Sequence, residues 1–532
     1  MPVVKEQEDV TTFQVENVSS RDNKEAQYSS FNVNEDEEKF VLDFNLVANI
    51  ASLCMLVAAM VWNQIVPSST IAFIAARFPE GASAAGWIAI TPSIIGSVVQ
   101  AVIGDLSDVF GRRSFLMVGC AAGILGTLLS GRANSMSMVI VGQAFNGFAT
   151  ACGFLSMPSL QEMIPKKLRP FAIASATLVS SFSLICGPIF VGLMIQNGIG
   201  GTLEGWRGGF YTSTGLWALT LAGLFFFYHP MDRLNPENLT VVQRLKKIDW
   251  LGIFLVAAGL TLFLLGLNYA NNPYRWTSAI VLGPLVTGGI VTILFILWEW
   301  KGTSNGILPH AIFQDRNYPL TIAVRITGGF ALLGAQAYIP QIAVNVFGTG
   351  GLKTAVWQLP LNVCSTLGAF VGFMLRYFKE VRWIIVGTLV GMVLGGGLMT
   401  MVKPGSNFAL WFFGNAIIGL SVGVEANLLT VVSSLFTPNE LIATGVCVCN
   451  SASFVGGAVA VTVYGTIFVN KLQTILPAEL TKSALNAGLP SSKHSRTPYG
   501  LCNRESKRYH SCSRGDGRDI GCNHRGIQTR IR

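Results

Sequence analysis

Two ionisable side chains stand inside long apolar segments, Arg325 within about 320–341 and Glu425 within about 408–430. A charged group in the interior of a membrane costs about 3 kcal/mol, so such residues are candidates for function. The guanidinium and the carboxylate are placed to form a pair, and protonation of Glu425 would break that pair and couple a proton to a change of shape. The alternative is a static structural ion pair, or charged groups that reach the membrane surface.

Neutral amide side chains form a second set inside the apolar segments. Amides can donate hydrogen bonds to, and accept them from, an uncharged, oxygen-rich ligand, while Phe and Trp on the same segments supply apolar walls. Alternatively, each amide makes a hydrogen bond between helices. As a set they favour an amphipathic ligand over a sugar phosphate or an amino acid. The ten amides are Asn63, Gln64, Gln143, Asn146, Gln336, Gln341, Gln358, Asn362, Asn415 and Asn427.

A polar stretch, GDLSDVFGRRS (104–114), separates two apolar segments. Gly104 permits close helix approach, and Gly111 can adopt a positive φ where the chain reverses. Asp108 is placed to pair with an arginine or to approach a helix N-terminus in an opposing half of the molecule. A basic loop alone explains only the two arginines, so the pattern predicts a conformational hinge. Its residues are Gly104, Leu106, Asp108, Gly111, Arg112 and Arg113.

The composition indicates the class of protein in which these charged and amide side chains are positioned. Of 532 residues, 51% are hydrophobic and 12% are charged, and the mean hydropathy is +0.50. A water-soluble protein carries about 25% charged residues, so the chain is expected to be an all-α integral membrane protein. The net charge of +9 is then explained by loop residues that orient membrane spans, without a nucleic-acid partner.

A membrane crossing needs about 20 apolar residues, and this length predicts thirteen spans. Lysine and arginine are more frequent in the turns that lie inside if the N-terminus is cytosolic, which favours that orientation. Trp206, Trp250, Trp276, Trp298, Trp300, Trp383 and Trp411 lie near span ends, as in an interfacial belt. The spans are about 45–66, 86–104, 115–131, 136–157, 171–196, 208–228, 250–269, 278–299, 320–341, 355–376, 383–402, 408–430 and 442–469.

The polar turn after the sixth span divides the chain into two helix bundles, as in many transporters. A fourteenth span that returns the chain to the inside is expected, and none is found in the sequence. The segments are a disordered acidic tail (1–44), an N-terminal six-helix bundle (45–228), a linker (229–249), two linking helices (250–300), a C-terminal bundle (301–470), an outer loop (471–492) and a polar basic tail (493–532).

No motif for an enzyme, a metal or a cofactor emerges. Cys502, Cys512 and Cys522 are ten residues apart, which fits no compact zinc site. A GxSxG pattern at 419–423 lies inside a span, without the strand-to-helix turn that a nucleophilic serine needs. The five histidines lie in loops or the tail, which argues against a membrane enzyme, and no folded output domain indicates a sensor.

The stretch from Gly104 to Arg113 resembles the signature cytosolic loop of the major facilitator superfamily, and it lies between the second and third spans as in that family. The resemblance covers about residues 40–490 and implies the major facilitator fold, two six-helix bundles, with two additional helices as in the fourteen-span subset. Segments 139–153, 204–218 and 246–252 are similar to the fungal trichothecene efflux pump family, which is related to siderophore–iron transporters.

This resemblance implies proton-coupled export of a bulky secondary metabolite such as a trichothecene-type mycotoxin from a fungal cell, by a monomer without cofactors. The expected location is the plasma membrane, with a vacuolar or vesicle membrane as alternatives. Uptake of siderophore–iron is the alternative function, but it would favour more basic residues around a cavity than Arg325 alone.

The chain departs from the superfamily pattern at two places. Gln143 stands where the fourth span often carries an arginine implicated in proton coupling, and an amide does not lower the pKa of a neighbouring carboxyl as a cation does. The antiporter motif of the fifth span is partial. Its Gly187 and Pro188 still predict a site of helix bending.

Overall fold

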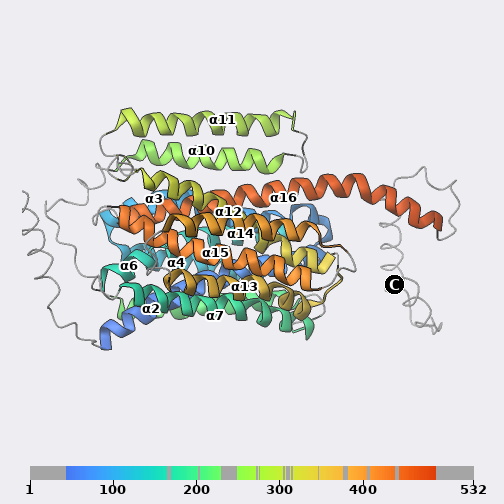
Figure 1. Cartoon of the computed structure of the whole chain (residues 1–532), viewed down its shortest axis with the longest axis horizontal. Coiled ribbons are helices and arrows are strands. Elements are labelled where there is room, and N and C mark those ends of the chain that lie inside the picture. Colours follow the sequence, from blue (N-terminus) through green and yellow to red (C-terminus); the bar gives the residue numbers. More distant parts are fainter. Residues whose placement is uncertain are drawn as a thin grey trace, which may run out of the picture. The chain divides into compact units, whose positions relative to one another are not determined.

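The computed structural model of the chain is almost entirely helical (Figure 1). Within the described ranges, an isolated bridge between Ala270 and Tyr274 is the sole β feature. Nearly all of the acidic tail, most of the linker and the whole basic tail lie outside these ranges, and at some helical positions the backbone alone is described. The described residues are 44–164, 169–199, 201, 204–228, 248–270, 274, 276–303, 306, 312, 316–345, 347–374, 381–403, 408–437 and 442–486.

Thirteen long helices in the described chain correspond to the thirteen predicted spans. Twelve are long and apolar enough to cross a membrane, so the chain is a multi-pass membrane protein. The remaining helix, α13, has a more polar sequence than the other twelve, and it packs against α7 and α15. The helices are α2 (Phe44–Arg77), α3 (Trp87–Phe110), α4 (Arg112–Gly131), α5 (Met136–Gly153), α7 (Arg169–Gln196), α8 (Trp206–Phe227), α10 (Trp250–Tyr269), α11 (Ala279–Leu297), α12 (Asn317–Asn345), α13 (Gly351–Met374), α14 (Val381–Thr400), α15 (Phe408–Phe436) and α16 (Ile442–Asn486).

The first helix is longer than predicted, because α2 continues past Pro67 to Arg77. Proline removes one backbone donor, and membrane helices tolerate it when neighbouring groups compensate. The carbonyl that loses its amide donor is that of Asn63. Three residues beyond the proline, Thr70 Oγ1 donates to the carbonyl oxygens of Val66 and Pro67, at 2.9 and 3.1 Å, and these bonds lie within the turn that follows. The sequence-based end at residue 66 was therefore wrong.

The last helix also exceeds the prediction. The segment 471–492 was expected to be an outer loop, but α16 continues to Asn486. Residues 471–486 include four Leu, two Ala and two Lys, which have high helix propensity, so loss of apolar character does not end the helix. The chain divides into two compact units after Gly465, and the helices that surround the candidate site belong to the first unit, residues 1–465.

The predicted reversal between α3 and α4 is present. Gly111 adopts φ +88° between the two helices, a conformation that L side chains rarely adopt. Arg112 and Arg113, expected in a loop, instead form the first turn of α4. A glycine at this position thus turns the chain within one residue.

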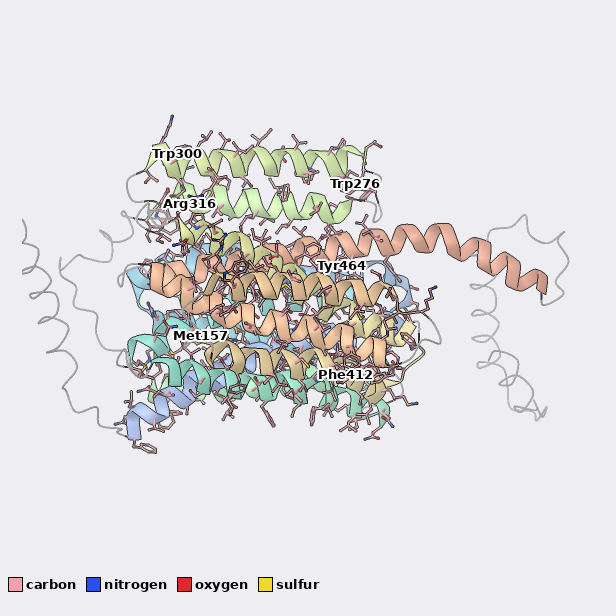
Figure 2. The ribbon with its side chains drawn as sticks, in the orientation of Figure 1. Met157, Trp276, Trp300, Arg316, Phe412 and Tyr464 are labelled. Atoms are coloured by element: carbon pink, nitrogen blue, oxygen red, sulfur yellow. The ribbon has the colours of Figure 1, made fainter. Side chains whose placement is uncertain are left out.

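The linking helices α10 and α11 pack side by side as a pair (Figure 1). Asp249 fixes the pair, because one carboxylate oxygen accepts from Gly252 N at 2.8 Å and the other accepts from Trp298 Nε1 at 2.9 Å. Trp276 and Trp300 lie at opposite ends of α11 (Figure 2), as an interfacial belt requires. Val256 and Phe295 pack with Val102 of α3 and attach the pair to the first bundle.

Candidate functional site

A cavity lies between helices of the two bundles. The space open to the centres of water molecules is about 30 Å³, room for about two waters, whereas pockets that hold small-molecule ligands measure about 300–1,000 Å³. The cavity must therefore enlarge to accept a bulky ligand. It is lined by Asn63, Gln64, Pro67 and Ser68 of α2, Ile88, Ala89, Pro92 and Ser93 of α3, Gln143, Asn146 and Thr150 of α5, Leu333, Gln336 and Ala337 of α12, and Phe454 and Val461 of α16.

The first bundle supplies a polar wall to this cavity. Asn63, Gln143 and Asn146 are 3%, 0% and 1% exposed. Within the described chain, no hydrogen-bond partner is present for Asn63 Oδ1, Gln143 Oε1 or either polar atom of the Asn146 amide. An unsatisfied buried polar atom costs about 1–3 kcal/mol. Polar atoms of a ligand in the cavity would remove this cost.

The other amide atom of Gln143 is engaged, because Nε2 donates to Ser130 Oγ of α4 at 3.2 Å. This bond holds the side chain against α4. Three cavity hydroxyls, Ser68, Ser93 and Thr150, were not among the predicted residues. Ser68 and Thr150 follow Gln64 and Asn146 by four residues, and this spacing places each hydroxyl on the same helix face as its amide.

The second bundle supplies a mostly apolar wall. Leu333, Ala337, Phe454 and Val461 line it, and Gln336 is its one amide. Of the described cavity residues, none is charged. The two walls together suit a neutral ligand with one polar and one apolar side.

The structure brings five of the ten predicted amides to the cavity, and the other five lie elsewhere. Gln341 and Asn415 donate to carbonyl oxygens of their own helices, those of Ala337 and Trp411. Asn427 Nδ2 also donates within its helix, to Gly423 O, and its Oδ1 accepts from Thr177 Oγ1 of α7 at 3.4 Å.

Gln358 and Asn362 of α13 connect the two bundles. Gln358 Oε1 accepts from Ser69 Oγ of α2 at 3.1 Å. Asn362 Nδ2 donates to Leu184 O of α7 at 2.9 Å. These amides act as contacts between helices, which was the alternative interpretation for each of them.

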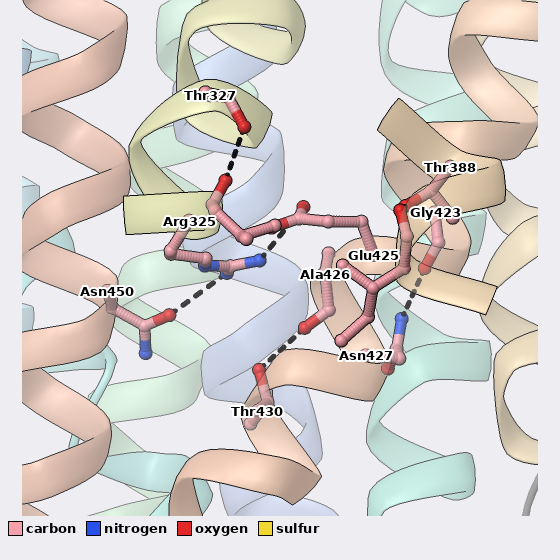
Figure 3. A network of polar contacts seen from close by, with 11 residues as sticks. Arg325, Thr327, Thr388, Gly423, Glu425, Ala426, Asn427, Thr430 and Asn450 are labelled. Atoms are coloured by element: carbon pink, nitrogen blue, oxygen red, sulfur yellow. Dashed lines mark hydrogen bonds and ion pairs between the residues drawn. The ribbon is translucent and has the colours of Figure 1, made fainter. Parts of the chain in front are cut away.

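Arg325 and Glu425 meet in the structure (Figure 3). Arg325 Nη1 of α12 lies 3.5 Å from Glu425 Oε2 of α15, and the two side chains are 11% and 1% exposed. Arg325 Nη2 also donates to Asn450 Oδ1 of α16 at 3.0 Å. The carboxylate packs against α12 at Gly328, where a Cβ atom would approach Glu425 Oε2 to 2.2 Å. Three helices of the second bundle therefore meet at one buried ion pair.

The stretch 104–114 is only partly described. The side chain of Asp108 lies outside the described part, so the expected pairing of this aspartate stays a prediction. Gly104 is buried, and its carbonyl oxygen accepts from Ser107 Oγ at 2.8 Å. Leu106 packs against the cluster that attaches α10 and α11.

The two arginines of this stretch differ in their surroundings. Arg112 is 5% exposed. Arg113 Nη2 donates to Phe225 O, near the end of α8, at 2.8 Å. This bond connects the start of α4 to the end of α8 in the first bundle.

Gly187 and Pro188 lie inside α7, which runs without a break from Arg169 to Gln196. A Cβ atom at Gly187 would be 3.7 Å from Ile65 and Trp62, an ordinary contact distance. Packing in this state therefore does not demand a glycine there, and the predicted role in bending stays a prediction.

An ion cluster at the start of α8 was not predicted. Arg77 at the end of α2 donates to Glu204 at 2.6 Å, and Arg207 donates to the other carboxylate oxygen of Glu204. Burial alone would raise the pKa of Glu204, but the hydrogen bonds from Arg207 and Arg77 lower it below its ordinary value. The contact between Arg77 and Glu204 has no local sequence pattern, because these residues are 127 positions apart. Glu204 and Arg207 are only three residues apart, so their spacing was the one available signal.

Comparison with known proteins supplies the context for this site. A sequence profile described as "Fungal trichothecene efflux pump" matches residues 10–499. The chain is 27% identical to the MFS-type transporter sphD of Aspergillus fumigatus, over 74% of this chain and 66% of that protein. It is 25% identical to the efflux pump dotC of Dothistroma septosporum, over 75% of this chain and 67% of that protein.

The fold has counterparts among solved structures. A bacterial homologue of the human lysosomal transporter Spinster, in an inward-facing and unoccupied conformation, has a TM-score of 0.56 and 15% identity, over 84% of this chain and 87% of that one. At this identity the likeness shows the fold alone. The profile match and the efflux-pump relatives confirm a transporter and argue against an enzyme.

Proposed function

Since the chain belongs to the fungal trichothecene efflux pump family, within the major facilitator superfamily of transporters, we propose that it exports a bulky, neutral secondary metabolite in exchange for protons. The observation that carries this proposal is the cavity with buried, unsatisfied amides on one wall and apolar side chains on the other. A trichothecene-type mycotoxin is the proposed cargo, and the plasma membrane of a fungal cell is the proposed location.

The cargo is proposed to bind with its oxygen-bearing side toward the first bundle. Asn63, Gln143 and Asn146 offer free amide atoms there, and a hydroxyl group satisfies either end of an amide because it both donates and accepts. The hydrocarbon side of the cargo would contact Phe454 and its neighbours on the second bundle. A cavity without described charges supports a neutral cargo over an anionic ferric complex.

The proton is proposed to bind at Glu425. While the carboxylate is charged, Arg325 is held between Glu425 and Asn450. Protonation removes the ionic attraction, so the arginine and the three helices that it joins become free to rearrange. Because the pair is apart from the cavity residues, cargo and proton would act at separate positions and communicate through helix movement.

The alternation between sides is proposed to open contacts that now hold the bundles together. Asn362 and Gln358 of α13 bond to α7 and α2, and both bonds cross between bundles. Each must break in one of the two states if the bundles rock about the cavity. The energetic cost is small, since hydrogen bonds between membrane helices contribute about 0.6 kcal/mol on average.

The test reconstitutes the full chain in liposomes and follows a radiolabelled trichothecene under an imposed pH gradient. The intact protein should transport it against its gradient, and Glu425→Gln should abolish the response to pH while cargo binding persists. Glu204→Gln, which removes a carboxylate outside the spans, serves as the matched control. Transport of a ferric siderophore in place of the trichothecene would contradict the cargo, and pH-driven transport by Glu425→Gln would contradict the coupling.

A further inference from the structure

One turn of α16 touches three different parts of the molecule. Its residues Asn450, Ser451 and Phe454 are all buried, at 4%, 6% and 5% exposure. Asn450 holds Arg325, and through it Glu425, at 3.0 Å (Figure 3). The other two face the first bundle.

Ser451 makes a hydrogen bond across the bundles. Its Oγ donates to Ser97 O of α3 at 2.7 Å, and both residues are buried. The acceptor is a backbone carbonyl inside a helix, so the contact fixes α16 against the body of α3. Such a bond cannot persist when the bundles separate at this level.

Phe454 lies at the end of this turn and lines the cavity. Its ring packs against Phe154, just after α5, with centroids 5.7 Å apart. It also packs on Gly96 of α3, where a Cβ atom would lie 3.1 Å from Phe454 Cδ1. The ring therefore closes one side of the cavity against the first bundle.

We propose that this turn of α16 transmits the state of the Arg325–Glu425 pair to the cavity, and that Ser451 is the positioning residue that couples the two. The proposal rests on the proposed proton-coupled export. With the ion pair intact, Asn450 anchors the turn, Ser451 bonds to α3 and Phe454 closes the cavity. When the pair breaks, Arg325 releases Asn450, and the turn moves as one rigid unit because its residues share a helix.

One charged side chain, Arg325, dominates the electrostatic surroundings of Glu425. Among the described groups, the charged or titratable side chains that face it are Arg325 of α12 and the thiol of Cys449 of α16. Helices α13 and α14 also pack against α15; their charged residues in the described region are Lys353 and Arg382, and Arg325 is the one charged side chain that acts on Glu425 there. Release of Arg325 is therefore the main electrostatic consequence of protonation.

The experiment uses the full chain in liposomes and two readouts, trichothecene transport under a pH gradient and maleimide labelling of Cys447 and Cys449. Both thiols are buried beside the turn, at 0% and 2% exposure. At pH 8, Ser451→Ala should be labelled about threefold faster than the intact protein at the same pH, the fold-change for an average hydrogen bond between membrane helices. Its pH-driven accumulation of the trichothecene should fall about threefold, while the KM for the cargo stays unchanged.

Two controls separate coupling from general damage. Ser451→Thr keeps the hydroxyl and should restore both readouts. Thr462→Val removes a hydroxyl that, among the described residues, bonds within α16 to Ala458 O, and this variant should behave as the intact protein. Gly96→Ala, which presses on Phe454 from α3, should reproduce the faster labelling of Ser451→Ala by a second route.

The outcomes distinguish the two proposals. If Glu425→Gln loses the pH response and is labelled faster while Ser451→Ala matches the intact protein, the link through α16 is overturned and proton-coupled export stands. If Glu425→Gln keeps the pH response, the proposed coupling and this link both fall.

Discussion

The two bundles share a packing scheme but place their polar side chains differently. In the first, α4 and α5 approach through glycines, and a Cβ atom at Gly142 would lie 2.6 Å from Gly126 O. In the second, α14 and α15 do the same, and a Cβ atom at Gly395 would lie 2.9 Å from Gly414 O. The glycines Gly142 and Gly414 thus occupy similar positions in the two bundles.

The residues that follow these glycines diverge. Gln143 and Asn146 line the cavity, whereas Asn415 bonds within its own helix and Ile418 packs in an apolar cluster. The second bundle instead holds the Arg325–Glu425 pair. Under the proposed function this difference would be a division of labour, in which the first bundle binds the polar side of the cargo and the second carries the group that titrates.

The largest effect is expected from breaking the ion pair on one side. Arg325→Met leaves Glu425 buried without its partner and should lower the free energy of unfolding by about 3–5 kcal/mol. The double variant Arg325→Met/Glu425→Leu should recover most of that loss, because no lone charge remains. Thermal unfolding of purified protein in nanodiscs measures both. A double variant as unstable as the single one would show that the pair stabilises the bundle by more than charge balance.

A smaller effect on binding is expected from the polar wall. Asn146→Leu keeps the volume of the side chain and removes its amide, so cargo affinity should fall about tenfold, as for one or two lost hydrogen bonds. Asn415→Leu is the matched change in the second bundle and should leave affinity unaltered. Equilibrium binding of a labelled trichothecene measures both, and equal losses in the two variants would contradict the division of labour.

Helix packing gives a third test of the shared scheme. Gly142→Ala brings a Cβ atom to 2.3 Å from Ser130 Oγ and 2.6 Å from Gly126 O, so the helices must separate, at a cost of about 1–3 kcal/mol. Gly396→Ala meets no atom within 4 Å among the described residues and should be neutral, or stabilising by up to about 1 kcal/mol, since alanine favours helix. Melting temperatures of the two variants check the contrast. Equal melting temperatures would overturn it.

The smallest effect is expected at the exposed end of the first bundle. The pKa of Glu204 is lowered in the folded chain, so its interactions stabilise the protein at neutral pH, and that contribution is lost as the pH falls through the lowered pKa. Glu204→Gln should therefore reduce stability by about 0.5–1 kcal/mol at pH 7 and by less at pH 3. Unfolding at the two pH values tests the sign, and a larger loss at pH 3 would be incompatible with it.

The sequence predicted the helices well because apolar length is a local property. The predicted ends were wrong where a helix continues beyond its apolar segment, past Pro67 in α2 and past residue 470 in α16. The sequence also identified Arg325 and Glu425 as a pair, since few charges stand in apolar segments and few partners were available.

The arrangement of neutral groups was less predictable. An amide in an apolar segment carries no sign of which helix face meets the cavity, so Asn146 and Asn415 look alike in sequence. Ser451 gave no signal at all, because its partner is a backbone carbonyl 354 residues away. The placement of these side chains depends on how distant helices pack, which periodicity alone does not determine.

The small volume of the cavity has a consequence for the cell. The cavity described above has room for about two waters, too few to form by themselves a file of water across a membrane. Under the proposed function, copies without cargo would then conduct few ions through this cavity, and a cell could hold many of them without losing its ion gradients.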